Sequence, residues 1–171
     1  MDKLINFIAF QIIWLVAVLG AANERLWPTI VLAFAFAIWQ LSPQRRHEND
    51  IKFVIYALIF GLILDSAWQM LGLIEYKLNL RYIAPIWILL LWVTLALTFN
   101  HSLSWLQKKT GFAIVFGSIG APLSYFAGNR LEAIHYPQGS LLISILLSVS
   151  WAAVCYFFVH QQTLYITKKT T

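Results

Sequence analysis

The sequence predicts an all-α membrane protein, a polytopic bundle of six transmembrane helices with both chain ends on the cytoplasmic side. Three observations predict this fold class: the composition, six apolar runs, and the placement of basic residues between the runs. Of the 171 residues 60% are hydrophobic and only 11% are charged, and the mean hydropathy is +0.72. Because soluble domains carry about 25% charged residues, a soluble fold of this length could not bury so much apolar surface.

The apolar runs define the six expected spans, since a transmembrane helix needs about 20 mostly apolar residues. They cover residues 4–22, 27–42, 52–73, 82–101, 112–130 and 139–160, within one domain of residues 1–171. The first run also resembles a signal peptide, but its basic start is thin and its apolar stretch is long. The fifth is rich in small residues, so we expect it to be the most enclosed helix, with a bend at Pro122.

Lysine and arginine placement predicts the orientation, because cytoplasmic loops carry an excess of both. With both ends inside, eight basic residues are cytoplasmic and four lie in outer loops. The inner ones are Lys3, Arg45, Arg46, Lys52, Lys108, Lys109, Lys168 and Lys169, and the outer ones are Arg25, Lys77, Arg81 and Arg130. Six spans would also permit two inverted halves. The only support is the similarity of "LDSAW" in the third span to "SVSW" in the sixth, which we treat as chance.

An acidic residue, Asp65, lies within the third span, roughly 20 Å from its inner end at 1.5 Å per residue. A charged side chain there costs about 2.5–3.5 kcal/mol on insertion scales, so we expect Asp65 to face the interior. Small and polar residues recur with it at helical spacing. They are Ala57, Gly61, Asp65, Gln69 and Gly72. We expect Asp65 to contact the fifth span at Ser124 or Tyr125, either as a structural hydrogen bond or as a functional site.

Nine polar and aromatic residues are candidates for ligand binding. They are Asp65, Trp68, Gln69, Ser124, Tyr125, Asn129 and Arg130 near the outer half, and Asn100 and His101 near the inner face. In the row Gly120, Ser124 and Gly128, the glycines are expected to let another helix approach. His101 is a candidate proton carrier, phosphate contact or interface histidine, and we prefer the last.

The sequence indicates no catalytic residue, cofactor or metal site. No serine lies in a nucleophile elbow, and the histidines show no HxxxH or HxxE spacing. The single cysteine, Cys155, excludes an internal disulfide. The basic residues lie in short clusters between apolar runs, so the net charge of +5 does not indicate nucleic-acid binding.

Three segments resemble a family of uncharacterised bacterial inner-membrane proteins of about this length. They read "GLILDSAW", "YIAPIWILLLWVTLALTFNHSLSWL" and "FGSIGAPLSYFAGNRL", and the resemblance covers nearly the whole chain. It implies matches at Asp65, Pro85, Trp87, Asn100, His101, Ser102, Trp105, Pro122, Tyr125, Gly128 and Arg130. One departure is Glu132, because the family pattern reads "G-x-R-L-G-A" where this chain reads "GNRLEA". The resemblance implies a bacterial inner-membrane location and, since such genes tend to accompany fatty-acyl-modifying enzymes, a link to lipid metabolism.

Three functions are consistent with these features. We prefer a protein that handles a lipid or lipophilic small molecule in a cavity lined by Asp65, Trp68, Ser124, Tyr125 and Asn129. Its expected partners are membrane lipids and a lipid-modifying membrane enzyme. The alternatives are a proton-coupled transporter in which Asp65 titrates, and a structural subunit of a membrane complex.

Overall fold

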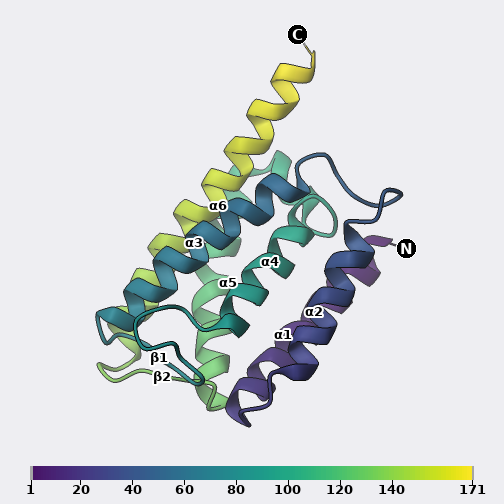
Figure 1. Ribbon diagram of the computed structural model, residues 1–171. Coiled ribbons are helices and arrows are strands. Elements are labelled where there is room, and N and C mark those ends of the chain that lie inside the picture. The colour runs from purple at the N-terminus through teal and green to yellow at the C-terminus, as the bar shows by residue number, and fades with distance from the viewer. Residues whose placement is uncertain (1, 171) are drawn as a thin grey trace.

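The computed structural model describes residues 2–170 (Figure 1). For residue 108 and residues 166–170 it describes the backbone only. Six α-helices occur within this range: α1 (Asp2–Ala22), α2 (Trp27–Gln40), α3 (Asp50–Met70), α4 (Ile86–Phe99), α5 (Thr110–Arg130) and α6 (Ser140–Thr170). Two short strands, β1 (Glu75–Tyr76) and β2 (Ile134–His135), and a 3₁₀ helix η1 (Ser104–Lys108) complete the order. The side chains of Lys108, Lys168 and Lys169, which the orientation argument counts, lie outside the described part.

The all-α helical bundle predicted from the sequence is confirmed. Four helices, α1, α3, α5 and the 140–165 part of α6, are long and apolar enough to cross a membrane. Helices α2 and α4 are apolar but have only 14 residues each, or about 21 Å, which is less than a hydrocarbon core of about 30 Å. The second and fourth spans are therefore shorter than expected. Pro28 starts α2 and Pro85 precedes α4, where the missing proline N–H costs no helical hydrogen bond.

Neighbouring helices run in opposite directions (Figure 1). Helices α1, α3 and α5 run toward the end that holds β1 and β2, and α2, α4 and α6 run back. The α1–α2 hairpin packs against α4, while α3 packs against α4 and α5 packs against α6. The start of α1 and the end of α6 therefore both lie at the end of the bundle opposite the strands. An even number of crossings requires this arrangement.

Helices α3 and α5 begin two copies of one α–β–α unit. Both helices have 21 residues and they start 60 positions apart, at Asp50 and Thr110. Each ends in the same turn, in which Gly72 and Glu132 adopt left-handed φ angles of 64° and 63°. Such a residue closes a helix because the following amides can then bond back to the last carbonyls.

Contacts between equivalent residues show that the two units are related by an approximate two-fold axis. Strand β1 pairs with β2 in antiparallel register, with Glu75 opposite His135. The rings of Trp92 in α4 and Trp151 in α6 stack with centroids 4.4 Å apart, and residues 99 and 158, both phenylalanine, stack at 4.7 Å. Because α3 and α5 run in the same direction (Figure 1), this repeat is parallel and is not the inverted arrangement that six spans would permit.

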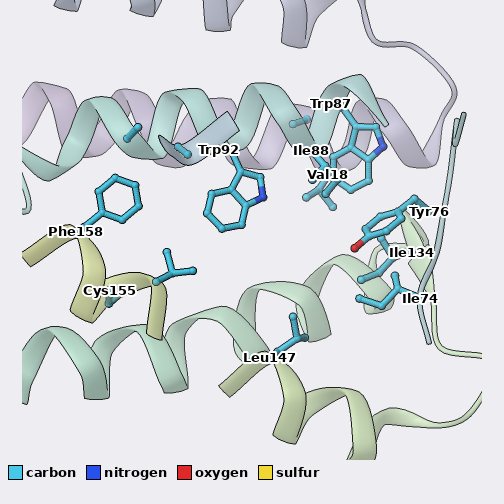
Figure 2. Packing of buried hydrophobic residues seen from close by; sticks show 14 of the residues in the cluster. Val18, Ile74, Tyr76, Trp87, Ile88, Trp92, Ile134, Leu147, Cys155 and Phe158 are labelled. Atoms are coloured by element: carbon cyan, nitrogen blue, oxygen red, sulfur yellow. The ribbon is translucent and has the colours of Figure 1, made fainter. Parts of the chain in front are cut away.

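The hydrophobic core lies between these units. Figure 2 shows Trp92 and Phe158 pointing into the space between α4 and α6, and the Tyr76 hydroxyl pointing inward from β1. Phe53 of α3 meets Phe158 edge-on, with ring centroids 5.0 Å apart. Aromatic side chains thus fill the centre of the bundle.

The prediction that the fifth span is the most enclosed helix is wrong. In its span 22% of the residues are buried, against 28% in α1 and 33% in α6. One row of its small residues packs closely on α6, because a Cβ at Gly117 would lie 2.5 Å from the Cys155 sulfur. The row with Gly120 does not mediate helix contact there, since a Cβ at Gly120 would meet nothing within 4 Å. Helix α5 continues through Pro122.

Candidate functional site

Asp65 is fully buried and lies at the centre of a group of hydrogen bonds. The Tyr125 hydroxyl donates to Asp65 Oδ1 over 2.5 Å, and the Tyr76 hydroxyl donates to the same oxygen over 2.6 Å. The Trp92 indole N–H donates to Oδ2 over 2.7 Å. The predicted contact between Asp65 and the fifth span is confirmed through Tyr125. We call these four residues the Asp65 cluster.

Four elements, α3, β1, α4 and α5, each supply one member of the Asp65 cluster. Gly61, one turn before Asp65, makes room for Trp92, because a Cβ at Gly61 would lie 2.4 Å from Cδ1 of that ring. The other face of the Trp92 ring stacks on Trp151. The indole is therefore held between α3 and α6, with its N–H directed at Asp65.

All three donors to Asp65 are uncharged groups. A tryptophan N–H can only donate, whereas a tyrosine hydroxyl can donate or accept. Burial raises the pKa of Tyr76 well above its usual value, and the nearby Asp65 carboxylate raises the pKa further. Tyr76 therefore keeps its proton and remains a donor. The arrangement holds the carboxyl group in one orientation and ties β1 to three helices.

A cavity of about 370 Å³ lies beside the Asp65 cluster, between α1, α4 and α5. Its size is within the usual range of about 300–1,000 Å³ for small-molecule pockets. Trp92 and Tyr125 line it, whereas Asp65 does not. Along α4 it extends from Trp87 to Phe99, which is about 18 Å of helix. Aliphatic, aromatic and small side chains form most of its surface.

The cavity opens at the outside of the bundle. Three of its lining residues, Phe7 of α1 and Phe116 and Leu123 of α5, are 42%, 45% and 61% exposed. Both helices are long and apolar enough to cross a membrane. The opening between them is therefore directed toward lipid.

Two of the amide and hydroxyl side chains that line the cavity have no hydrogen-bond partner among the described residues. Gln11 lines the wall formed by α1, and Ser124 lines the wall formed by α5. Both are exposed to the cavity or its opening, and neither side chain makes a hydrogen bond to a described residue. A molecule in the cavity would meet them together with the indole N–H groups of Trp14 and Trp151, which also make no hydrogen bond to a described residue.

Gln69 and Asn129, both predicted to bind a ligand, instead close turns at the strand end of the bundle. The Gln69 amide donates to the Arg81 carbonyl over 2.6 Å, and its Oε1 is buried with no hydrogen-bond partner among the described residues. The Asn129 amide donates to the Ile134 carbonyl over 3.0 Å. Neither residue lines the cavity.

Trp68 and Arg130 also lie outside the cavity. The carbonyl of Trp68 accepts the Leu73 amide over 2.9 Å in the turn after α3. The Arg130 guanidinium stands over the Phe126 ring, 5.1 Å from its centre. Of the expected lining residues only Ser124 and Tyr125 face the cavity, because the cavity is on the far side of Tyr125 and Trp92 from Asp65.

The remaining two predicted residues, Asn100 and His101, meet a second buried acid that the sequence argument missed. Asp50 is fully buried at the start of α3. Its Oδ2 lies 2.9 Å from His101 Nε2 and accepts the His47 backbone amide over 2.7 Å. Its Oδ1 accepts the Asn100 amide over 2.9 Å. An acid in the first turn of a helix usually offsets the helix dipole at the surface, so the sequence offered no signal of burial.

A chain of polar side chains continues from His101 to α1. The Gln40 amide nitrogen lies 3.2 Å from His101 Nδ1, and Gln40 Oε1 accepts the Asn6 amide over 2.7 Å. Asn6 Oδ1 in turn accepts the Ser102 hydroxyl over 2.7 Å. This Asp50 network, comprising Asp50, Asn100, His101, Gln40, Asn6 and Ser102, joins α1, α2, α3 and the end of α4. In it His101 has a structural partner at each ring nitrogen.

No set of three or more histidine, cysteine, aspartate or glutamate side chains that could hold a metal ion occurs in the described part of the chain. The two acids, Asp65 and Asp50, lie in separate clusters fifteen positions apart on α3. The uncharged side chains that line the cavity offer hydrogen bonding and apolar contact.

Tyr76 and Trp92 are the other functional residues that sequence reasoning did not identify. Each has an apolar ring and one polar atom, which needs a partner when buried. That property was the available signal, but it does not say which acceptor a given ring will meet.

No curated protein and no solved structure matches the chain. The model of one protein family matches residues 3–157. This segment contains the Asp65 cluster, the Asp50 network and the three segments that carry the resemblance. The match confirms the resemblance to a family of uncharacterised proteins over nearly the whole chain. The chain therefore belongs to the family described as "Protein of unknown function (DUF2878)".

Proposed function

We propose that this protein binds a membrane lipid by holding an acyl chain in the cavity between α1, α4 and α5. The observation that carries the proposal is the cavity itself: about 370 Å³, mainly apolar, and open between two helices that can cross a membrane. We place the protein in the bacterial inner membrane with both ends in the cytoplasm, on the family resemblance and the distribution of basic residues.

The dimensions of the cavity support an acyl chain as the occupant. It follows α4 for about 18 Å, slightly more than one leaflet of a hydrocarbon core of about 30 Å. Gly120 and Gly128 on α5 line it, and the space beside Gly120 is open. Small residues on this wall therefore leave room for a chain that lies parallel to the helices.

The Asp65 cluster supports this function as a positioning element. Tyr125 and Trp92 each present a ring to the cavity and a hydrogen-bond donor to Asp65. Asp65 thereby fixes the shape of the wall without touching the occupant. The alternative of proton-coupled transport has less support, because Asp65 is fully buried and separated from the cavity by these two rings.

Filling the cavity from α5 tests the proposal. Gly120→Phe would place a ring in the open space of the cavity, and Gly111→Phe is the matched control, since Gly111 also has no neighbour within 4 Å but does not line the cavity. We expect native mass spectrometry of the detergent-purified proteins to show one retained lipid for the wild type and for Gly111→Phe. Gly120→Phe should lose it while keeping its helical circular dichroism. Equal lipid retention by both folded variants would show that the cavity does not hold a lipid.

A further inference from the structure

We infer that the chain bound in the cavity carries an uncharged oxygen, a hydroxyl or a keto group, part-way along its length, and that Gln11 and Ser124 are the side chains that bind oxygen of this kind. The inference rests on the proposed function and names the class of ligand. Its basis is the presence of two polar side chains that face the cavity without a partner.

Both side chains lie at depths where no water is available. Gln11 is nine residues into α1 and Ser124 is fourteen residues into α5, or about 14 Å and about 21 Å along helices that cross a core of about 30 Å. Polar groups in hydrocarbon must be satisfied from within the protein or by what it binds. An amide and a hydroxyl left facing lipid would be costly to maintain.

The other polar residues of the cavity show what satisfied groups look like here. Thr98 donates to the Leu95 carbonyl over 2.6 Å, Ser102 donates to Asn6 and Tyr125 donates to Asp65. Serine on a helix commonly bonds a carbonyl of the preceding turn, as Ser118 does with Val115. Ser124 makes no such bond to a described residue, so its hydroxyl is available to a ligand.

The chemistry of the two side chains selects the ligand group. Glutamine offers two N–H donors and one carbonyl acceptor, and serine offers one donor and two lone pairs. Each of them can therefore bind a hydroxyl or a keto oxygen on a chain in the cavity. Among the described side chains, no aspartate, glutamate, lysine, arginine or histidine lines the cavity. An ionised group at this depth would have no counter-charge there, and a plain saturated chain would leave both side chains unpaired.

Binding of stearic acid and of its mid-chain hydroxy and keto derivatives tests the inference. Trp14, Trp87, Trp92 and Trp151 line the cavity, so intrinsic fluorescence in detergent reports occupancy. We expect the oxygenated chains to bind about tenfold more tightly than stearic acid, the ratio that about 1.4 kcal/mol produces. In Gln11→Leu and Ser124→Ala this preference should shrink while the affinity for stearic acid is kept or increased. Ser118→Ala, which lies outside the cavity, should retain the preference.

The possible outcomes separate this inference from the proposed function. Equal affinity of the wild type for all three chains would overturn the inference and leave acyl binding intact. A preference that survives in both Gln11→Leu and Ser124→Ala would overturn the assignment of these residues. Absence of binding of every chain would refute the proposed function, and the inference with it. Both positions are exposed and make no side-chain bond to a described residue, so the variants should fold.

Discussion

The Tyr125 hydroxyl donates to Asp65 Oδ1 over 2.5 Å, and these two residues occupy equivalent positions, 60 apart, in the repeated helices α5 and α3. This hydrogen bond thus connects the two units across their approximate two-fold axis. Asp65 also accepts donors from β1 and α4. The acid in the apolar run therefore joins the parts of the bundle that form one wall of the cavity.

Replacing Asp65 by leucine should destabilise the protein more than replacing it by asparagine. Leucine leaves the donors of Tyr76, Trp92 and Tyr125 unpaired in a buried site, and each such group costs about 1–3 kcal/mol. Asparagine keeps one acceptor oxygen but introduces donors, so it should retain part of the network. Thermal unfolding in detergent, followed by circular dichroism, measures both. Wild-type stability of Asp65→Leu would show that the cluster contributes nothing to folding.

Gly61→Ala should lower the stability, although alanine is the better helix former by about 1 kcal/mol. The added Cβ would lie 2.4 Å from the Trp92 ring, so the indole must shift away from Asp65 and from its stack on Trp151. Gly111→Ala is the control, because its Cβ meets nothing within 4 Å. We expect Gly111→Ala to be neutral or slightly stabilising. Equal melting temperatures for the two variants would contradict the tight contact at Gly61.

Asp50→Asn should destabilise the inner end of the bundle. Asparagine keeps one acceptor oxygen, so its NH2 group must face either the Asn100 amide, which bonds Oδ1, or the His101 ring and the His47 backbone N–H, which lie at Oδ2. We expect a loss of about 1–3 kcal/mol for each group left without an acceptor. Asp2→Asn makes the same change at a side chain that is 77% exposed, where the expected effect is within about 0.5 kcal/mol. The prediction fails if denaturant unfolding gives similar changes for both.

Glu132→Gly should stabilise the turn after α5. Glu132 has a φ of 63°, and a non-glycine residue in this region costs about 1–2 kcal/mol, part of which the greater freedom of glycine in the unfolded chain offsets. The equivalent residue of the first unit provides the converse test, since Gly72→Ala at a φ of 64° should destabilise. Opposite signs of the two changes in melting temperature are expected, and the same sign would argue against matching turns.

The orientation can be tested with single cysteines after Cys155 is replaced by alanine. Leu80 lies in the α3–α4 connection and is 51% exposed, while Gln44 lies in the exposed α2–α3 connection. With both chain ends in the cytoplasm, a membrane-impermeant maleimide added to spheroplasts should label Leu80→Cys and not Gln44→Cys. After lysis it should label both. Labelling of Gln44→Cys but not of Leu80→Cys before lysis would show the opposite orientation in the membrane.

The approximate positions of the helices and the inward direction of Asp65 follow from local sequence properties. Hydropathy alone locates the apolar helices, because the bilayer demands long apolar segments whose backbone groups bond internally. The spacing of small and polar residues around Asp65 showed which side of α3 faces the interior, and the depth of Asp65 matched that of Tyr125. Helix geometry alone gives both results, without knowledge of which side chains bond to Asp65.

Tertiary structure alone decided the partners and the cavity. Tyr76 and Trp92 reach Asp65 from 11 and 27 positions away, and His101 meets Asp50 from 51 positions away. The arrangement of the helices also decided that the row of small residues with Gly117 on α5 packs on α6, while the row with Gly120 borders the cavity. The physical reason is that helices in a membrane associate through close packing and hydrogen bonds, which leave no hydropathy pattern along the chain.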